Sequence, residues 1–181
     1  IVLSMPIKQK ENQHDLSLKH QKWLVENFKN VEAHTISLDD LFKTFSSTLN
    51  KFDNEHGFAN SRARLRMTTL YQVAAANKGI VVGTGNKVED FGVGFYTKYG
   101  DGGVDISPIA DCNKTQIWEL GKELGILKEI IDAPPTDGLW DDGRTDEGQL
   151  GFKYQDLEDA MVNSDSPHKV EYEKIRKQNL H

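Results

Sequence analysis

The first part of the chain alternates between short apolar runs and segments with helical spacing. Ile1–Met5 is mostly apolar and ends at a proline, which is typical of a buried strand. Leu16–Phe28 has apolar residues at helical intervals, and Asp15 is expected to cap this helix. Val31–Ser37 predicts a second strand, and a second helix is expected to reach about Asn50. This order predicts an α/β fold with a parallel sheet that carries helices on both faces.

Composition limits the class of protein. A chain of 181 residues fits one domain with a real core. The net charge of -6 does not favour nucleic acid as a partner. Apolar runs stay far below membrane-spanning length, so no membrane association is expected. Cys112 is the single cysteine and cannot form an internal disulfide, and we expect a cytoplasmic protein.

A glycine-rich stretch occupies the middle of the chain, from Gly79 to Pro108. It opens with the apolar run Ile80–Val82, which predicts a third, buried strand. Ligands of open α/β sheets bind beyond the carboxyl ends of strands, so the loop after this run is a candidate binding site. Lys98, Asp101 and Asp105 are spaced through a glycine-rich bend, which suits a polar, multiply charged substrate. A solvated loop that happens to carry charge is the alternative.

A long helix is predicted before this stretch, from about Asn60 to Asn77. Its apolar residues Met67, Leu70, Tyr71 and Ala74 fall at i, i+3, i+4 and i+7, which predicts a buried stripe. Arg64 and Arg66 border that stripe, where a guanidinium reaches into a cleft and offers a planar fork to phosphate or carboxylate. Arg62 lies furthest from the stripe and is interpreted as an arginine that snorkels from the helix edge with its charge exposed to water, whereas Arg64 is a candidate ligand-binding residue.

Two further candidates for ligand binding come after the glycine-rich stretch. Lys114 is expected in the first turn of a helix that reaches Leu124, where a cation opposes the helix dipole unless an anion is bound. Asp132–Gly148 is rich in proline, glycine and aspartate, and a long polar loop of this kind is usually a lid or a binding loop. Thr136 follows two prolines in that loop. Asp146 and Glu147 are interpreted as helix-start acids in preference to metal ligands.

Taken in order, these segments resemble the NAD synthetase family. The pattern N-S-R-A-R-L-R-M is followed by G-T-G-N-K-V-E-D, T-K-Y-G-D-G-G-V-D, N-K-T-Q, A-P-P-T and D-E-x-x-L-G-F-x-Y. The set runs from Asn60 to Tyr154 and is far more specific than any one piece. The resemblance implies a Rossmann-like parallel sheet flanked by helices, as in other ATP pyrophosphatases. It also implies a homodimer with deamido-NAD bound across the subunit boundary.

The resemblance further implies a ligase for the last step of NAD biosynthesis. ATP would adenylate the nicotinate carboxylate of deamido-NAD with release of pyrophosphate, and ammonia would then displace AMP. Mg²⁺ and cationic side chains would neutralise the phosphates. Carried over by motif, the implied contacts are Thr84, Lys114 and Thr136 for ATP, Glu89 for Mg²⁺, and Arg64, Lys98, Asp105 and His181 for deamido-NAD, with Asn60 and Asp101 close by.

The sequence departs from the family pattern at two places. The family's Ser-Gly-Gly-x-Asp-Ser loop is not in these residues, and Ile1 lies inside a strand-like run. We therefore expect one synthetase domain, residues 1–181, that is incomplete at its N-terminus and not fully active as given. One additional residue between Glu89 and Lys98 leaves Asp90 open as the metal ligand, although the spacing from Thr84 favours Glu89.

Two other interpretations stay open. The chain could be the synthetase domain of a glutamine-dependent NAD synthetase, whose amidase domain would precede Ile1. It could instead be a non-catalytic module that binds a dinucleotide or nucleotide. The residues given do not separate the ammonia-dependent from the glutamine-dependent enzyme.

Overall fold

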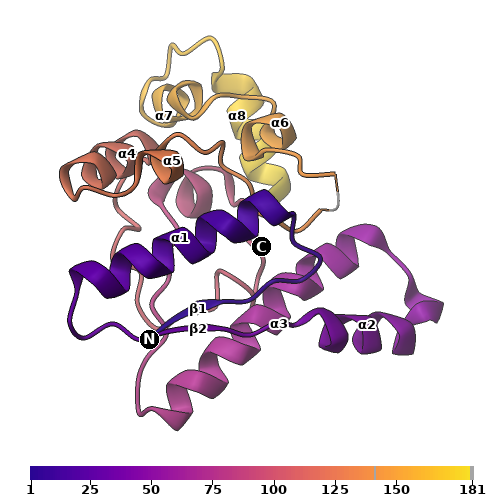
Figure 1. Cartoon of the computed structure of the whole chain (residues 1–181). Helices are drawn as coiled ribbons and strands as arrows, with labels where there is room; N and C mark the ends of the chain where they lie inside the picture. Colours follow the sequence, from indigo (N-terminus) through magenta and orange to yellow (C-terminus); the bar gives the residue numbers. More distant parts are fainter. Residues whose placement is uncertain (141, 180–181) are drawn as a thin grey trace.

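The structure is a computed structural model that describes residues 1–140 and 142–179 of the chain (Figure 1). In chain order its elements are β1 (Val2–Ser4), α1 (Glu11–Asn27), β2 (Ala33–Thr35), α2 (Asp39–Thr48), the short 3₁₀ helix η1 (Asn50–Phe52), α3 (Glu55–Ala76), the π-helical turn η2 (Val88–Val93), α4 (Lys114–Glu123), α5 (Lys128–Ile131), α6 (Asp146–Leu150), α7 (Tyr154–Val162) and α8 (Lys169–Asn179).

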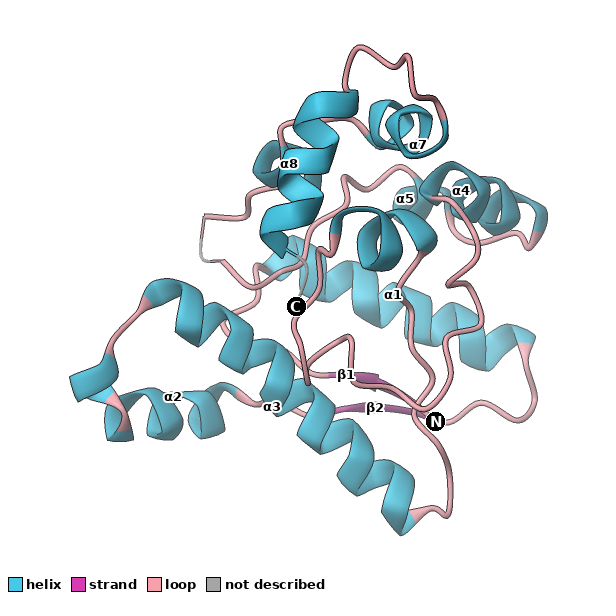
Figure 2. Ribbon diagram, turned by 180° about the vertical axis from the view of Figure 1, so that it is seen from behind, coloured by secondary structure: helices cyan, strands magenta, loops and turns pink. Residues whose placement is uncertain are grey.

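β1 and β2 form a parallel pair, in which Leu3 lies opposite His34. Helix α1 lies on one side of the pair and α3 on the other, as the two opposite views show (Figures 1 and 2). The predicted order of strand, helix, strand and helix is therefore confirmed, and the chain has an α/β fold.

The predicted third strand, Ile80–Val82, is wrong as a strand. Within the described residues this run makes a single parallel bridge, between Val82 and Ile106. Val81 is buried, but the flanking Ile80 and Val82 are 60% and 53% exposed. The physical reason is that a strand needs a partner on its edge. β1 faces this run across a cavity and does not pair with it, so the described sheet has two strands.

Helix α1 begins four residues before the predicted cap, so the prediction that Asp15 caps it is wrong. The helix starts at Glu11, and Lys10 holds the extended backbone of a cap residue. The Lys10 carbonyl accepts the backbone N–H of His14 at 3.0 Å, which is the first helical turn. Asp15 therefore lies inside the helix, where its backbone cannot take the extended conformation of a cap.

Helix α3 also begins earlier than predicted. The Asn54 side chain caps it by accepting the backbone N–H of Gly57 at 2.7 Å. Of the predicted apolar stripe only Met67 is buried, whereas Arg62 is 6% exposed. The interpretation of Arg62 as an exposed residue is wrong because α2 packs on this half of α3. Its guanidinium lies 5.0 Å from the centre of the Phe42 ring.

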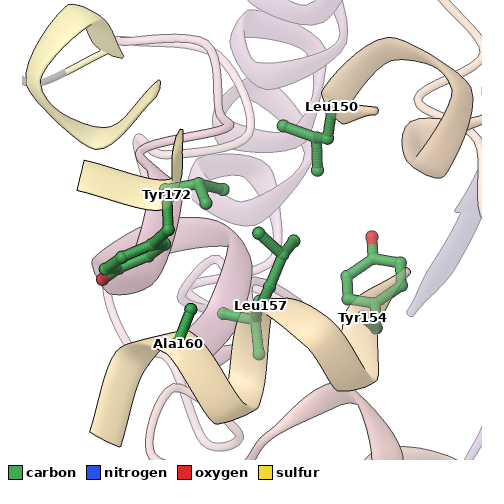
Figure 3. Close-up of a cluster of buried hydrophobic side chains, with 7 residues drawn as sticks. Leu150, Tyr154, Leu157, Ala160 and Tyr172 are labelled. Atoms are coloured by element: carbon green, nitrogen blue, oxygen red, sulfur yellow. The ribbon is translucent and has the colours of Figure 1, made fainter. Parts of the chain in front are cut away.

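The apolar core is divided into two clusters. One cluster joins η2, α6, α7 and α8 and consists of Val88, Val93, Leu150, Tyr154, Leu157, Ala160 and Tyr172 (Figure 3). The other is built around Ile7, Leu38 and Phe42, near the carboxyl end of β1. The cavity described below lies between the segments that the two clusters stabilise.

Among the described residues, no helix is both long enough and apolar enough to cross a lipid bilayer.

Candidate active site

A cavity of about 1120 Å³ is formed by β1, α3, the segment after Val82 and the loop before α6. Five of the residues predicted to bind substrates line this cavity: Asn60, Arg64, Thr84, Lys98 and Asp101. A volume of this order is enough for a nucleotide-sized ligand. The structure therefore brings half of the predicted site residues to one hollow.

The wall of the cavity nearest α3 is held by hydrogen bonds between the predicted residues and the 97–101 segment. Arg64 Nε donates to the Lys98 carbonyl at 3.1 Å. The Thr97 hydroxyl donates to Asn60 Oδ1 at 2.7 Å, and the Thr97 backbone N–H donates to Asp101 Oδ1 at 3.0 Å. Arg64, Asn60 and Asp101 thus fix the loop that carries Lys98, and the Lys98 side chain stays exposed.

A second polar cluster lies beside the cavity, where η2, α4, α6 and α7 meet. Lys114 Nζ donates to Glu89 Oε1 at 2.9 Å, and the Tyr154 hydroxyl donates to the same oxygen at 2.6 Å. The Tyr154 hydroxyl also lies 3.1 Å from Asp146 Oδ2. We call Glu89, Lys114, Tyr154 and Asp146 the Glu89 cluster. π-Helical turns such as η2 are rare and are often found at functional sites.

Electrostatics in the Glu89 cluster follow from burial. Burial, and then the nearby Glu89 carboxylate, raises the pKa of Asp146 to about 6. The same two causes raise the pKa of Asp90 to about 6. Burial also raises the pKa of the Tyr154 hydroxyl, which therefore keeps its proton and donates it. The cluster gathers more carboxylates than cations, so it suits a ligand that carries positive charge.

The side chains of this region can be compared with the ligands that Mg²⁺ requires. Among the described residues, no group of three or more His, Cys, Asp or Glu side chains could hold a metal ion. Mg²⁺ in nucleotide sites is usually held by one or two carboxylates together with substrate phosphates and water. Glu89 supplies one such carboxylate, so the donor set fits a metal that arrives with ATP and does not fit an ion held by protein alone.

Asp105 lies apart from the cavity lining of the described chain. Its Oδ2 accepts the backbone N–H of Val81 at 2.7 Å, and its Oδ1 accepts the Tyr71 hydroxyl at 3.2 Å. Asp105 therefore links its own segment to Tyr71 of α3 and to Val81 through hydrogen bonds. Its predicted contact with deamido-NAD stays a prediction.

The loop before α6 closes one end of the cavity. Asp137, Leu139, Trp140 and Arg144 line it, and the Arg144 guanidinium lies 4.1 Å from the centre of the Trp140 ring. Thr136 belongs to this loop, and its hydroxyl donates to the Arg144 carbonyl at 2.9 Å. Thr136 thus organises the loop in the described structure. The position agrees with the expected lid, and its contact with ATP stays a prediction.

Sequence reasoning missed Tyr154 and left Asp146 as a helix-start acid. Asp146 does start α6, where Thr145 caps the helix, but the residue is only 6% exposed and its carboxylate reaches into the Glu89 cluster. The D-E-x-x-L-G-F-x-Y motif, which contains both residues, was the available signal. His181, the remaining predicted residue, lies outside the described residues.

Comparisons with known proteins identify relatives of this chain. The family model described as NAD synthase matches residues 1–181. The NH(3)-dependent NAD(+) synthetase of Carboxydothermus hydrogenoformans is 40% identical over 146 residues, which cover 78% of this chain and 59% of that protein. The chain thus spans a little more than half the length of this curated relative.

Two solved structures share the fold. The NMN synthetase of Francisella tularensis superposes with a TM-score of 0.86 at 33% identity, over 99% of this chain and 74% of that chain. The NH3-dependent NAD synthetase of Campylobacter jejuni, in complex with a nitrate ion, superposes with a TM-score of 0.71 at 22% identity, over 98% of this chain and 72% of that chain.

Proposed function

The chain belongs to the NAD synthase family, and we propose that it converts deamido-NAD to NAD with ATP and ammonia. The observation that carries the proposal is the family match over residues 1–181, together with the gathering of Asn60, Arg64, Thr84, Lys98 and Asp101 around one cavity. Curated relatives whose names specify NH(3) favour ammonia over glutamine as the nitrogen source.

The proposed reaction has two steps. An oxygen of the nicotinate carboxylate attacks the α-phosphorus of ATP, and pyrophosphate leaves. Ammonia then attacks the carbonyl carbon of the acyl-adenylate, loses a proton, and expels AMP to leave the amide. A carboxylate is a poor electrophile, so activation by adenylation is what makes the second step accessible. Both steps develop negative charge on phosphate oxygens, which cationic side chains stabilise.

The residues are proposed to divide between the two substrates. Thr84 is proposed to contact ATP from the cavity lining, Lys114 from the first turn of α4, and Thr136 from the loop before α6. Arg64 and Lys98 meet the phosphates of the dinucleotide, with Asn60, Asp101, Asp105 and His181 completing that site. A Mg²⁺ carried by ATP would be held by Glu89 and would neutralise the triphosphate.

A second candidate substrate is nicotinate mononucleotide, which would be amidated to NMN. The observation that favours it is the Francisella tularensis NMN synthetase, which matches almost the whole chain at 33% identity. The amide-forming chemistry is the same, because the reacting nicotinate carboxylate is common to both substrates. The two candidates differ in whether an adenylate half must be bound beyond the first phosphate.

Three structural expectations accompany the function as proposals. The two-stranded parallel pair belongs to a Rossmann-like sheet flanked by helices on both faces. The active form is a homodimer with the dinucleotide across the subunit boundary. The enzyme acts in the cytoplasm. Light scattering of the purified protein, with and without deamido-NAD, tests the homodimer directly.

The function is tested by direct assay of the full natural protein. Deamido-NAD and nicotinate mononucleotide are supplied separately with ATP and Mg²⁺, and ammonium or glutamine serves as the nitrogen source. We expect NAD from deamido-NAD with ammonium, and release of pyrophosphate and AMP in equal amounts. Faster conversion of the mononucleotide would select the second candidate. Absence of amide and of pyrophosphate with both substrates would contradict the proposal and favour a binding module.

A further inference from the structure

We propose that Tyr154 is a positioning residue, whose hydroxyl, backed by Asp146, holds Glu89 and Lys114 in place for the metal-bound triphosphate. This inference rests on the proposed function. The Tyr154 hydroxyl donates to Glu89 Oε1 at 2.6 Å and lies 3.1 Å from Asp146 Oδ2. It therefore joins two carboxylates that come from η2 and α6.

The ring of Tyr154 is rigidly held. It is fully buried in the cluster drawn in Figure 3, and the Trp118 ring packs against it edge-on at 5.9 Å. Lys114 Nζ lies 5.0 Å from the centre of the same ring, within the range of a cation–π contact. One side chain thus contacts both the acidic and the basic member of the predicted ATP site.

The hydrogen bonds to Glu89 are unevenly distributed. Among the described residues, both side-chain bonds to its carboxylate fall on Oε1, one from Lys114 and one from Tyr154. This arrangement occupies Oε1 and leaves Oε2 to accept a cation or a donor brought by the substrate. A carboxylate that presents one oxygen in a fixed direction is what a metal site with few protein ligands requires.

Asp146 completes the support behind Tyr154. Its side chain is buried, and its Oδ1 has no hydrogen-bond partner within the described part of the chain. A buried carboxylate oxygen without a partner costs free energy, so its presence calls for an explanation. Its other oxygen, Oδ2, lies 3.1 Å from the Tyr154 hydroxyl, and we attribute the buried carboxylate to this place behind the group that contacts Glu89, because residues behind a metal ligand orient that ligand.

The alternative is a core tyrosine whose hydroxyl merely finds a nearby acceptor. The two readings differ in what loss of the hydroxyl does. A merely structural hydroxyl affects folding stability alone. A positioning hydroxyl also changes how tightly the metal-bound nucleotide is held and how fast adenylation proceeds, while binding of the dinucleotide is unaffected.

The test is Tyr154→Phe in the full natural protein, with Tyr172→Phe as the matched control. Tyr172 is buried in the same apolar cluster but lies on α8, where the Lys169 ammonium approaches its ring at 5.5 Å. We expect Tyr154→Phe to lower kcat about 10- to 100-fold, the usual effect of removing a residue behind a metal ligand. KM for deamido-NAD should stay within about twofold, and calorimetry should show weaker binding of Mg·ATP. Tyr172→Phe should change neither kcat nor the affinity for Mg·ATP.

The outcomes separate this inference from the proposed function. If the unmodified protein makes no amide, the proposed function fails, and binding of Mg·ATP to the two variants still tests the positioning role. A folded Tyr154→Phe protein with unchanged kcat and unchanged Mg·ATP affinity overturns the inference. Should that variant not fold, Asp146→Asn replaces it, and the same weakening of Mg·ATP binding is required of it.

Discussion

Lys114 and Glu89 form an ion pair that links the first turn of α4 to the π-helical turn η2. The ammonium nitrogen lies 2.9 Å from Glu89 Oε1, and both side chains are largely buried, at 18% and 16% exposed. A lysine in the first turn of a helix opposes the helix dipole. The ion pair therefore explains how Lys114 is accommodated at this position, because the negative charge of Glu89 offsets the unfavourable interaction of the ammonium with the helix dipole.

The pair predicts strong coupling between the two residues. Lys114→Met and Glu89→Gln should each destabilise the fold, because each leaves the other charge largely buried without its partner. The double variant should recover part of the loss, with a coupling free energy of about 1–3 kcal/mol in urea unfolding. Additive effects within about 0.5 kcal/mol would mean that the two side chains do not interact in solution.

The same variants address the metal ligand. Glu89→Gln should be less stable but still folded in the full natural protein, and it should abolish most pyrophosphate release, because a neutral amide is a weak ligand for Mg²⁺. Asp90→Asn is the matched control from the same turn. Unchanged pyrophosphate release by Glu89→Gln, together with a loss in Asp90→Asn, would transfer the metal role to Asp90.

Asp105 is expected to act on both stability and binding. Asp105→Ala removes the acceptor for the Val81 N–H, which should cost about 1.5 kcal/mol, the low end of the range for hydrogen bonds to charged groups, because Asp105 is exposed. Tyr71→Phe is the control, since it removes one contact of Asp105 and keeps the carboxylate. If Asp105 also binds substrate, calorimetry should show weaker deamido-NAD binding in Asp105→Ala alone, with ATP binding unchanged.

Much of the local structure was predictable, because it depends on neighbours in sequence. The alternation that predicted β1, α1, β2 and α2 needs only short-range periodicity. The helix from Lys114 was also predicted correctly, since Asn113 and Gln116 form its start through a hydrogen bond of 2.8 Å. Helix caps were harder to predict from the sequence. Helix α1, for example, begins after an extended Lys10 that makes no side-chain capping hydrogen bond.

Features that depend on distant parts of the chain were missed. Whether Ile80–Val82 becomes a strand depends on what lies at its edge, and among the described residues its bridge is to Ile106 alone, outside the sheet. Arg62 is buried because α2 packs over it, which helical spacing does not reveal. Tyr154 and Glu89 are 65 residues apart, so the Glu89 cluster exists only once the chain has folded.

The stability of the fold should fall as the pH rises from about 4 to 6. In the folded protein the pKa of Asp146 is raised to about 6, whereas an unfolded aspartate titrates near its ordinary value of about 3.9. Between these values the folded protein holds the proton that the unfolded chain has lost. Raising the pH therefore removes stability, by about 2–3 kcal/mol for this group. Asp90, with its pKa raised to about 6, acts in the same direction.

The measurement is urea unfolding at intervals between pH 4 and pH 8, with Asp146→Asn beside the unmodified protein. The variant cannot ionise at this position, so its stability should depend less on pH and should exceed that of the unmodified protein at pH 8. Asp142→Asn is the control. The pKa of Asp142 is lowered to about 2 by hydrogen bonds from Arg144, so its titration falls below this window. An equal slope in all three proteins would contradict the pH dependence assigned to Asp146.

Gly83 is expected to tolerate no side chain, because the segment that carries Thr84 packs closely against Val104. A Cβ atom at Gly83 would lie 2.6 Å from Val104 Cγ2, and Val104 is β-branched and has few alternative rotamers. The backbone N–H of Gly83 donates to the Ile106 carbonyl at 2.7 Å, so the clash would strain the bridge between Val82 and Ile106. Gly83→Ala should therefore destabilise the fold by about 1–3 kcal/mol and weaken ATP binding through Thr84.

Gly121→Ala in α4 is the matched control, since its Cβ would lie 3.6 Å from Ile131 and helix propensity favours alanine by about 0.5–1 kcal/mol. Urea unfolding should move the two variants in opposite directions, and a Gly83→Ala protein as stable as the unmodified one would show that Val104 yields and that the close packing does not hold the segment.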